Sequence, residues 1–251
     1  IIARKPLDLA AREFGKPYIE LAALSAQVMN KILDKRNARK APHLDDKIIV
    51  SWNGLMLAAY ARAGKALGVP RYLEIARKAA SYLLENAFDN EGNLRRVVGS
   101  QAELAATLED YAYLIEGLIA LYKAEKDVRL TESIESLISA TNVLFFDQSS
   151  QGYFYTQQNS RLIFRIKTPD DGTLPNANAV MAQNLLDMYE VTGNDSYRHQ
   201  AQSLIEYYMR ANTKPQLDYA CMLASGLKLH RLLEGTSFEM PQTFSMDNHT
   251  G

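Results

Sequence analysis

Apolar residues recur at the spacing of an α-helix along almost the whole chain. Positions i, i+3, i+4 and i+7 repeat in separate segments, which places the apolar side chains of each segment on one face. These segments span residues 21–32, 55–63, 72–83, 111–122, 134–145, 180–188, 197–208 and 219–227. Every second segment, beginning with residues 55–63, is rich in Ala, Met and Gly, and the segments between them carry more charge. The pattern predicts an all-α chain built of helical hairpins.

Small residues let helices approach closely, so the Ala-rich segments suit an inner ring and the charged segments an outer one. Repeated hairpins of this kind form either a closed α/α toroid or an open solenoid. A toroid is favoured because the inner segments are apolar all round. The predicted β-structure is a small β-hairpin in a loop, formed by residues 152–156 and 162–166, and a shorter extended stretch at residues 93–98.

The domain prediction follows from where the periodicity stops. Residues 1–234 are expected to form one α/α-hairpin toroid domain, and residues 235–251, which have no period, a loosely ordered tail. The chain opens with Ile1 instead of Met, so we expect a fragment of a longer protein.

Charge and composition exclude several partners. The 28 basic residues are balanced by 29 acidic ones and no basic run stands apart, which argues against a nucleic-acid partner. No apolar stretch reaches the roughly 18 residues of a membrane span. Cys221 is the only cysteine and nothing resembles a secretory signal, so a cytoplasmic location is expected. Without ligand-spaced His, Asp or Glu clusters, we expect no metal and no cofactor.

The inner segments share one further feature, because each opens on polar or aromatic residues. The openings are Trp52-Asn53, Glu109-Asp110-Tyr111, Asn176-Ala177-Asn178 and Asp218-Tyr219. In a toroid the inner helices run the same way, so their free N–H groups gather at one end. Aromatic rings beside carboxylates and amides suit a sugar, which has an apolar face and a hydroxyl rim. The alternative is that these residues only cap helices, with Ser51 and Thr107 as candidate caps.

Adjacent carboxylates lie at or just before the inner helices, in Asp45-Asp46, Glu109-Asp110 and Asp170-Asp171. Glycoside hydrolysis needs two carboxyl groups, one as acid and one as base or nucleophile. Asp110 and Asp171 come from neighbouring inner helices and are the predicted catalytic pair. A simple turn is the alternative for Asp170-Asp171, because Asp-Gly after Pro169 favours turns. The histidines His43, His199, His230 and His249 are absent from the inner openings, which counts against a histidine-based epimerase.

Several strings resemble one family. They are His43-Leu44-Asp45-Asp46-Lys47, Ser51-Trp52-Asn53-Gly54-Leu55-Met56, Leu108-Glu109-Asp110-Tyr111-Ala112, Asp171-Gly172, Pro175 and Asn178. Together they resemble the spermatogenesis-associated protein 20 family, also called DUF255, over roughly residues 1–232. Asn176-Ala177 depart from the Ser-Gly that this family usually has there.

The resemblance implies a six-hairpin glycosidase-like toroid that follows a thioredoxin-like domain, which is absent from this chain. The segment would supply about four of the six hairpins and leave the ring incomplete. It also implies a fold similar to N-acylglucosamine 2-epimerases, cellobiose epimerases and α/α-barrel glycosidases. Because the motifs match, the resemblance also implies a set of site residues, which are Asp46, Trp52, Asn53, Asp110, Asp171 and Asn178.

Two functions are predicted. The first is a carbohydrate-active domain, glycoside hydrolase or sugar isomerase, with Asp110 and Asp171 as catalytic residues. Its predicted substrate-binding residues are Asp46, Trp52, Asn53, Tyr111, Asn176, Asn178 and Tyr219. Trp52 would be a stacking platform, and core packing is the alternative for this residue. The second function is a non-catalytic binding or scaffold module that works with the thioredoxin-like domain.

Overall fold

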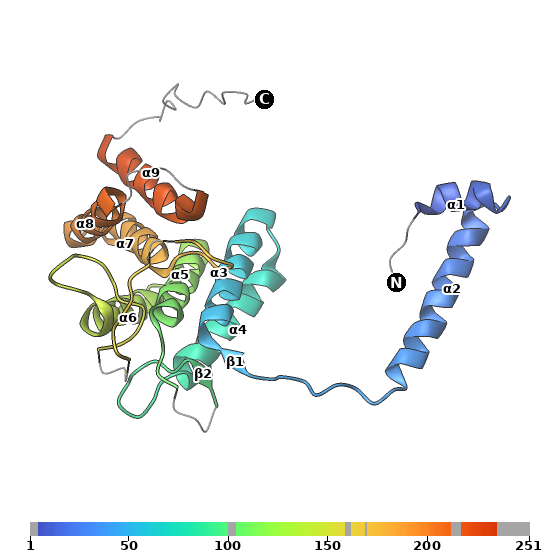
Figure 1. Cartoon of the computed structure of the whole chain (residues 1–251), viewed down its shortest axis with the longest axis horizontal. Coiled ribbons are helices and arrows are strands. Elements are labelled where there is room, and N and C mark those ends of the chain that lie inside the picture. The colour runs from blue at the N-terminus through green and yellow to red at the C-terminus, as the bar shows by residue number, and fades with distance from the viewer. Residues whose placement is uncertain (1–4, 100–103, 159–161, 169, 212–216, 235–251) are drawn as a thin grey trace. The chain divides into compact units, whose positions relative to one another are not determined.

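The computed structural model describes residues 5–99, 104–158, 162–168, 170–211 and 217–234. The chain divides into two compact units, Ile1–Asp46 and Lys47–Gly251 (Figure 1). One domain over residues 1–234 stays a prediction, and the predicted tail at residues 235–251 lies outside the described residues.

The first unit is a pair of helices, α1 (Leu7–Glu13) and α2 (Tyr18–Asn37). Gly15, with a φ of +60°, lies in the turn between them, where a residue without Cβ adopts this conformation at little cost. Among the described residues of this unit Ala11 is buried, whereas apolar side chains of α2 such as Leu24 and Val28 are exposed. The bounds of α2 confirm the helix predicted around residues 21–32.

The second unit holds the other predicted helices. Its elements are β1 (Ile48–Ile49), α3 (Val50–Leu67), α4 (Pro70–Asn86), β2 (Val97–Val98), α5 (Leu108–Glu125), α6 (Arg129–Phe145), α7 (Ala177–Thr192), α8 (Asp195–Ala211), η1 (Leu217–Tyr219) and α9 (Ala220–Glu234). α3 and α4, α5 and α6, and α7 and α8 form hairpins in chain order, and α9 follows. The predicted all-α hairpin architecture is confirmed.

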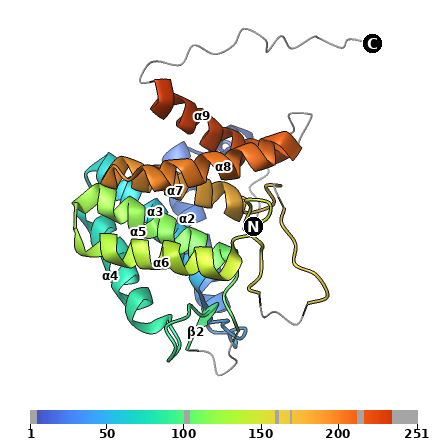
Figure 2. The same ribbon diagram turned by 90° about the vertical axis from the view of Figure 1, so that its left-hand side faces the viewer.

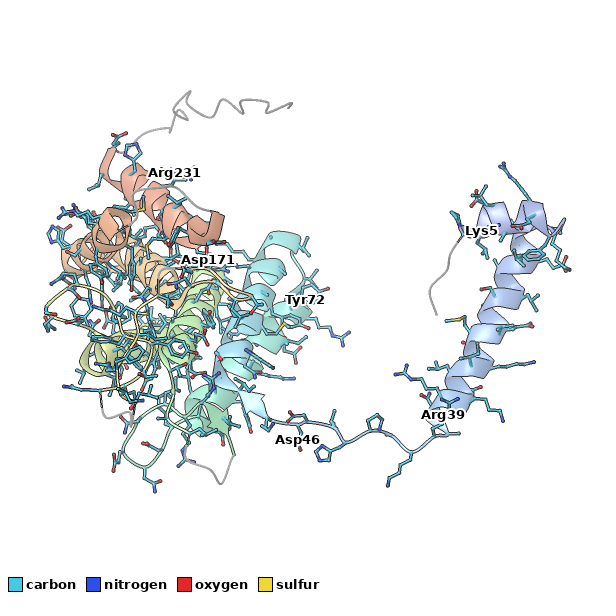
Figure 3. All side chains as sticks on the ribbon, viewed as in Figure 1. Lys5, Arg39, Asp46, Tyr72, Asp171 and Arg231 are labelled. Atoms are coloured by element: carbon cyan, nitrogen blue, oxygen red, sulfur yellow. The ribbon has the colours of Figure 1, made fainter. Side chains whose placement is uncertain are left out.

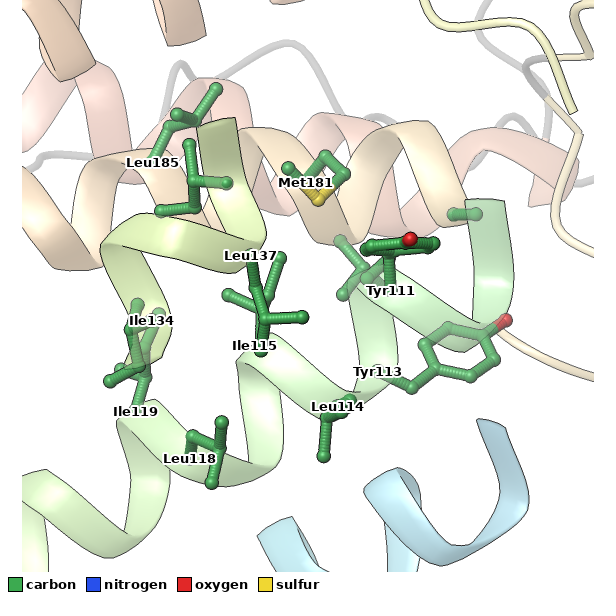
Figure 4. Packing of buried hydrophobic residues seen from close by; sticks show 14 of the residues in the cluster. Tyr111, Tyr113, Leu114, Ile115, Leu118, Ile119, Ile134, Leu137, Met181 and Leu185 are labelled. Atoms are coloured by element: carbon green, nitrogen blue, oxygen red, sulfur yellow. The ribbon is translucent and has the colours of Figure 1, made fainter. Parts of the chain in front are cut away.

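The helices sort into inner and outer ones as the composition predicts. α3, α5, α7 and α9 contact one another in chain order, while α4, α6 and α8 pack beside them (Figures 1 and 2). α5 and α7 are buried on nearly every side. Their core joins Ile115 of α5, Leu137 of α6 and Met181 of α7 (Figure 4). Burial of this apolar surface is the main force that holds the unit together.

Glycine brings the first two inner helices into backbone contact. A Cβ on Gly54 of α3 would lie 2.5 Å from the carbonyl carbon of Tyr113 in α5. A Cβ on Gly117 of α5 would lie 2.8 Å from the carbonyl oxygen of Gly54. Any larger residue at either position would push the two helices apart. The small residues of the inner segments thus act as their composition predicts.

The small sheet includes the end of the extended stretch predicted at residues 93–98, but it does not include the predicted hairpin. Among the described residues it pairs Ile48–Ile49 with Val97–Val98, in antiparallel register. The predicted strands at residues 152–156 and 162–166 do not form, although the Tyr155 N–H donates to the Ile166 carbonyl at 2.8 Å. The backbone of the first segment instead bonds to helix starts, because the Tyr155 carbonyl accepts from the Leu108 N–H at 3.0 Å. The hairpin prediction is wrong because the local alternation of apolar and polar residues does not show that the backbone bonds to helices far away in the sequence.

Candidate functional site

The N-terminal ends of the inner helices are joined to one another. The Ser51 N–H in α3 donates to Asp110 Oδ1 in α5 at 3.1 Å. The Tyr113 hydroxyl in α5 donates to the carbonyl of Pro175, just before α7. The Cys221 N–H in α9 donates to Asp171 Oδ2 at 2.8 Å. These contacts place the starts of all the inner helices of this unit at one end, so the helices run in the same direction.

Asp110 lies inside the protein at this end. Its Oδ2 accepts from the Thr107 N–H at 2.9 Å and from Arg96 Nη1 at 3.3 Å. Thr107 and Asp110 form a capping box, which confirms Thr107 as the cap of α5. Ser51 is not a cap, because α3 already begins at Val50 and the Asp110 carboxylate of α5 accepts its N–H. With 0% of its surface exposed, Asp110 has the geometry of a structural carboxylate.

Asp171, labelled in Figure 3, accepts hydrogen bonds from the starts of both α7 and α9. Its Oδ1 accepts from the Asn176 N–H at 2.9 Å and its Oδ2 from the Cys221 N–H at 2.8 Å. Burial, together with the nearby Asp171 carboxylate, raises the pKa of the Cys221 thiol to about 11. The thiol is therefore protonated at neutral pH and is a poor nucleophile.

Two asparagines shape the start of α7. Asn176 is the N-cap, and its Oδ1 accepts from the N–H groups of Asn178 and Ala179. The side chain of Asn178 is buried and forms two hydrogen bonds with the backbone of Tyr153, accepting from its N–H at 2.9 Å and donating to its carbonyl at 3.1 Å. The Tyr153 segment is thereby fixed to α7.

A cavity of about 190 Å³ lies at the starts of α5 and α7. Its polar lining residues are Glu109, Tyr155, Thr168, Asp170, Thr173, Asn176 and Asn178. Leu108, Leu174 and Pro175 add apolar surface. The Tyr155 hydroxyl donates to Glu109 Oε2 at 3.0 Å, and burial followed by the Glu109 charge raises the pKa of Tyr155. The phenol thus stays a donor at neutral pH.

The predicted site residues are only partly brought together. Asn176 and Asn178 line the cavity. Asp110 and Asp171 do not line it, but each directly follows a lining carboxylate in the sequence. The polar lining residues that the predicted set lacks are Glu109, Tyr155, Thr168, Asp170 and Thr173. The adjacent carboxylates were visible in the sequence, whereas Tyr155 lies in the wrongly predicted hairpin and Thr168 follows it, so neither was expected near the helix starts.

The remaining predicted residues lie elsewhere. Tyr111 is buried in the core, where its hydroxyl accepts from the Leu94 N–H at 3.1 Å. Trp52 is 60% exposed on α3, and Asn53 Nδ2 donates to the Ile49 carbonyl at 2.8 Å. Tyr219 is half-buried in η1. None of these residues lines the cavity, and their binding roles stay predictions.

Asp46 is exposed at the end of the first unit (Figure 3), and its binding role also stays a prediction. Within the described ranges no group of three His, Cys, Asp or Glu side chains could hold a metal ion. No helix of the described part of the chain is long and apolar enough to cross a membrane.

Comparison with solved structures defines the class of fold. A GH76 α-mannanase of Bacteroides thetaiotaomicron superposes with a TM-score of 0.62 at 16% identity, over 78% of this chain and 55% of the mannanase. The cellobiose 2-epimerase of Spirochaeta thermophila gives 0.60 at 15% identity, over 77% of this chain and 55% of the epimerase. A D-mannose isomerase gives 0.52 at 16% identity, over 64% and 41%. The second unit therefore has the fold of part of an α/α toroid of the six-hairpin glycosidase-like type, as predicted.

Sequence comparison then gives the family, although no family model matches the chain. The chain is 33% identical to human spermatogenesis-associated protein 20 over 209 residues, which is 78% of this chain and 27% of the relative. The mouse protein is 32% identical over the same length and 26% of it is covered. The aligned part of the chain therefore belongs to the spermatogenesis-associated protein 20 family, as its motifs predict. It spans about a quarter of the length of these curated relatives.

Proposed function

We propose that the second unit binds a carbohydrate in the cavity at the starts of α5 and α7, as a domain of the glycoside hydrolase or sugar isomerase type. The observation that carries this proposal is the cavity lining. Glu109 and Asp170 offer acceptors for sugar hydroxyls, and Leu174 and Pro175 offer apolar surface for the face of a sugar ring. First-turn N–H groups of the inner helices add a partial positive charge at the same end.

The volume of the cavity limits the size of the ligand. Pockets for drug-sized ligands enclose roughly 300–1,000 Å³, and this cavity encloses about 190 Å³. The expected ligand is therefore a monosaccharide, or a single residue at the end of a longer glycan. The mannanase, the epimerase and the isomerase that share this fold are named for their action on sugars, which supports the proposed ligand class. Fold likeness alone carries no activity.

Sugar binding here does not require the predicted catalytic roles of Asp110 and Asp171. Both carboxylates already accept hydrogen bonds from within the protein. Their catalytic roles stay predictions.

The test is a calorimetric and thermal-unfolding titration of the chain with D-mannose, D-glucose and cellobiose. A sugar present at a free concentration of about ten times its Kd is expected to stabilise the folded state by about 1.4 kcal/mol. Thr173→Trp introduces an indole at an exposed residue of the cavity lining and should abolish the stabilisation. Val143→Trp, at a site 77% exposed on α6, is the matched control and should bind normally. No stabilisation by any of these sugars at millimolar concentration would contradict the proposal.

A second candidate is a non-catalytic module that docks on the thioredoxin-like domain implied by the family resemblance. The observation in its favour is an exposed apolar segment, in which Leu162, Ile163 and Phe164 are 58%, 101% and 71% exposed. If this segment docks, Phe164→Ser should weaken co-purification with that domain, supplied from a relative, and sugar binding should be unchanged. No association of the unmodified chain would count against this candidate.

A further inference from the structure

We propose that the neighbouring carboxylates at the cavity divide their tasks, so that Glu109 and Asp170 contact the ligand while Asp110 and Asp171 hold the helix starts. This inference rests on the proposed sugar binding and names the residues that perform it. It exchanges each member of the predicted catalytic pair for the residue directly before it.

The first carboxylate pair shows the division most clearly. Asp110 is fully buried, and both of its oxygens accept hydrogen bonds within the protein. Glu109 is half-buried and lines the cavity. Successive residues of a helix point about 100° apart, so two neighbours at a helix start face different surroundings. One faces the core and the other the cavity.

The second carboxylate pair divides in the same way, although it precedes α7 in a loop. Both oxygens of Asp171 accept backbone N–H groups, from Asn176 and Cys221. Asp170 is exposed and lines the cavity. Its backbone carbonyl accepts from Asn176 Nδ2 at 3.1 Å, which fixes the backbone at this position. The Asp170 side chain carries no hydrogen bond among the described residues.

Tyr155 is the positioning residue for Glu109. Its carbonyl accepts from the Leu108 N–H at 3.0 Å, which sets it beside the first turn of α5. Its hydroxyl donates to Glu109 Oε2 at 3.0 Å and takes only one of the two carboxylate oxygens. Glu109 Oε1 can then accept a hydrogen bond from a ligand hydroxyl.

The first experiment needs no ligand. The native chain is treated with a carbodiimide and glycine ethyl ester, and modified carboxyls are located by peptide mass spectrometry. Glu109 and Asp170 are expected to react at least tenfold faster than Asp110 and Asp171. Comparable or reversed rates within either carboxylate pair would overturn the division, whatever the outcome for sugar binding.

The second experiment measures affinity for D-mannose and cellobiose by calorimetry. Glu109→Gln and Asp170→Asn are expected to fold normally and to weaken binding at least tenfold, whereas Glu132→Gln, at an exposed position on α6, should bind as the unmodified chain does. Unchanged affinity in both cavity variants would overturn the inference and leave the proposed function standing. If the unmodified chain binds neither sugar, the proposed function fails together with the ligand contacts, and the labelling rates still decide the structural roles.

Discussion

The two ends of the inner helices are built differently. At the C-terminal ends, Lys123 of α5 donates to Asp187 of α7 at 2.8 Å, Lys228 of α9 binds the same carboxylate, and Glu190 accepts from Lys123 at 3.1 Å. At the N-terminal ends, carboxylates accept backbone N–H groups of the neighbouring helix. The N-terminal carboxylates and Lys123, in the last turn of α5, each complement the partial charge of the helix end where they lie.

The ends also differ in what they leave for a ligand. A cavity of about 480 Å³ lies at the C-terminal side, lined in part by Arg62, Lys65 and Lys123. Arg62 pairs with Glu116 at 2.7 Å and Lys65 donates to the Lys123 carbonyl at 3.0 Å. The larger cavity is therefore lined by charged groups that already have protein partners. The smaller N-terminal cavity is lined by Asp170, whose side chain has no hydrogen-bond partner among the described residues. The comparison teaches that the larger cavity is not the one whose lining leaves a carboxylate available to a ligand.

Removing Asp110 should have the largest effect on stability. Asp110→Ala removes the carboxylate half of the capping box of α5 and leaves the buried Ser51 N–H without its acceptor, so we expect a loss of about 3 kcal/mol in the free energy of unfolding. Urea unfolding measures it. Glu109→Ala, one residue away, is the control and should cost less than about 1 kcal/mol. Equal losses in the two variants would show that the neighbouring carboxylates do not differ as the structure indicates.

The C-terminal network should respond to both mutation and pH. Asp187→Asn leaves Lys123 and Lys228 with Glu190 alone, and should cost about 2 kcal/mol at pH 7, less than for a fully buried pair because Lys123 is a third exposed. Burial by itself would raise the pKa of Asp187, but Lys228 and Lys123 more than offset it, so this pKa is lowered.

A carboxyl group whose pKa is lowered on folding contributes stability above its unfolded pKa of about 3.9, and the contribution is lost as the pH falls through the folded value. The difference between the unmodified chain and Asp187→Asn should therefore shrink steadily when urea unfolding is repeated below pH 4. A difference that does not change between pH 7 and pH 2 would mean that the lysines do not stabilise the charged form.

Asp171 should have a smaller effect than Asp110. Asp171→Ala removes the acceptor for the N–H groups of Asn176 and Cys221, but this region is only half-buried and water can replace part of the loss. We expect about 1–2 kcal/mol in urea unfolding. A cost equal to that of Asp170→Ala, the adjacent control, would contradict the structural role of Asp171.

The smallest expected effect is on the phenol beside Glu109. The Glu109 charge helps to raise the pKa of Tyr155, because a carboxylate disfavours a nearby phenolate. Glu109→Gln should therefore lower the pKa of Tyr155 toward its ordinary value. NMR titration of the labelled tyrosine ring carbons, with Tyr155→Phe to assign the signal, measures this shift. An unchanged pKa would mean that the two groups are not in contact.

Helix positions and their inner or outer placement were predictable because both follow from local period and residue size. Gly54 and Gly117 show why, since the contact they permit depends only on having no side chain. The cap at Thr107 was predictable for the same reason, because a capping box spans one helical turn.

Features that depend on distant partners were not predictable. The Ser51 N–H is satisfied by Asp110, 59 residues away, so the local cap prediction at Ser51 was wrong. Period alone could not decide which carboxylate of Glu109-Asp110 faces the cavity, because that depends on where Arg96 and Tyr155 lie. The predicted hairpin was wrong because Tyr153 and Tyr155 bond to helix starts.

The central claim is that a sugar binds at the N-terminal ends of the inner helices and not at the C-terminal ends. A two-dimensional amide NMR titration of the chain with D-mannose tests it most directly, because each end has its own reporter residues. We expect the largest shifts at Glu109, Asp170 and Asn176, and none at Lys123 or Asp187. Shifts centred on Lys123 and Asp187, or no shifts at either end at millimolar sugar, would contradict the account.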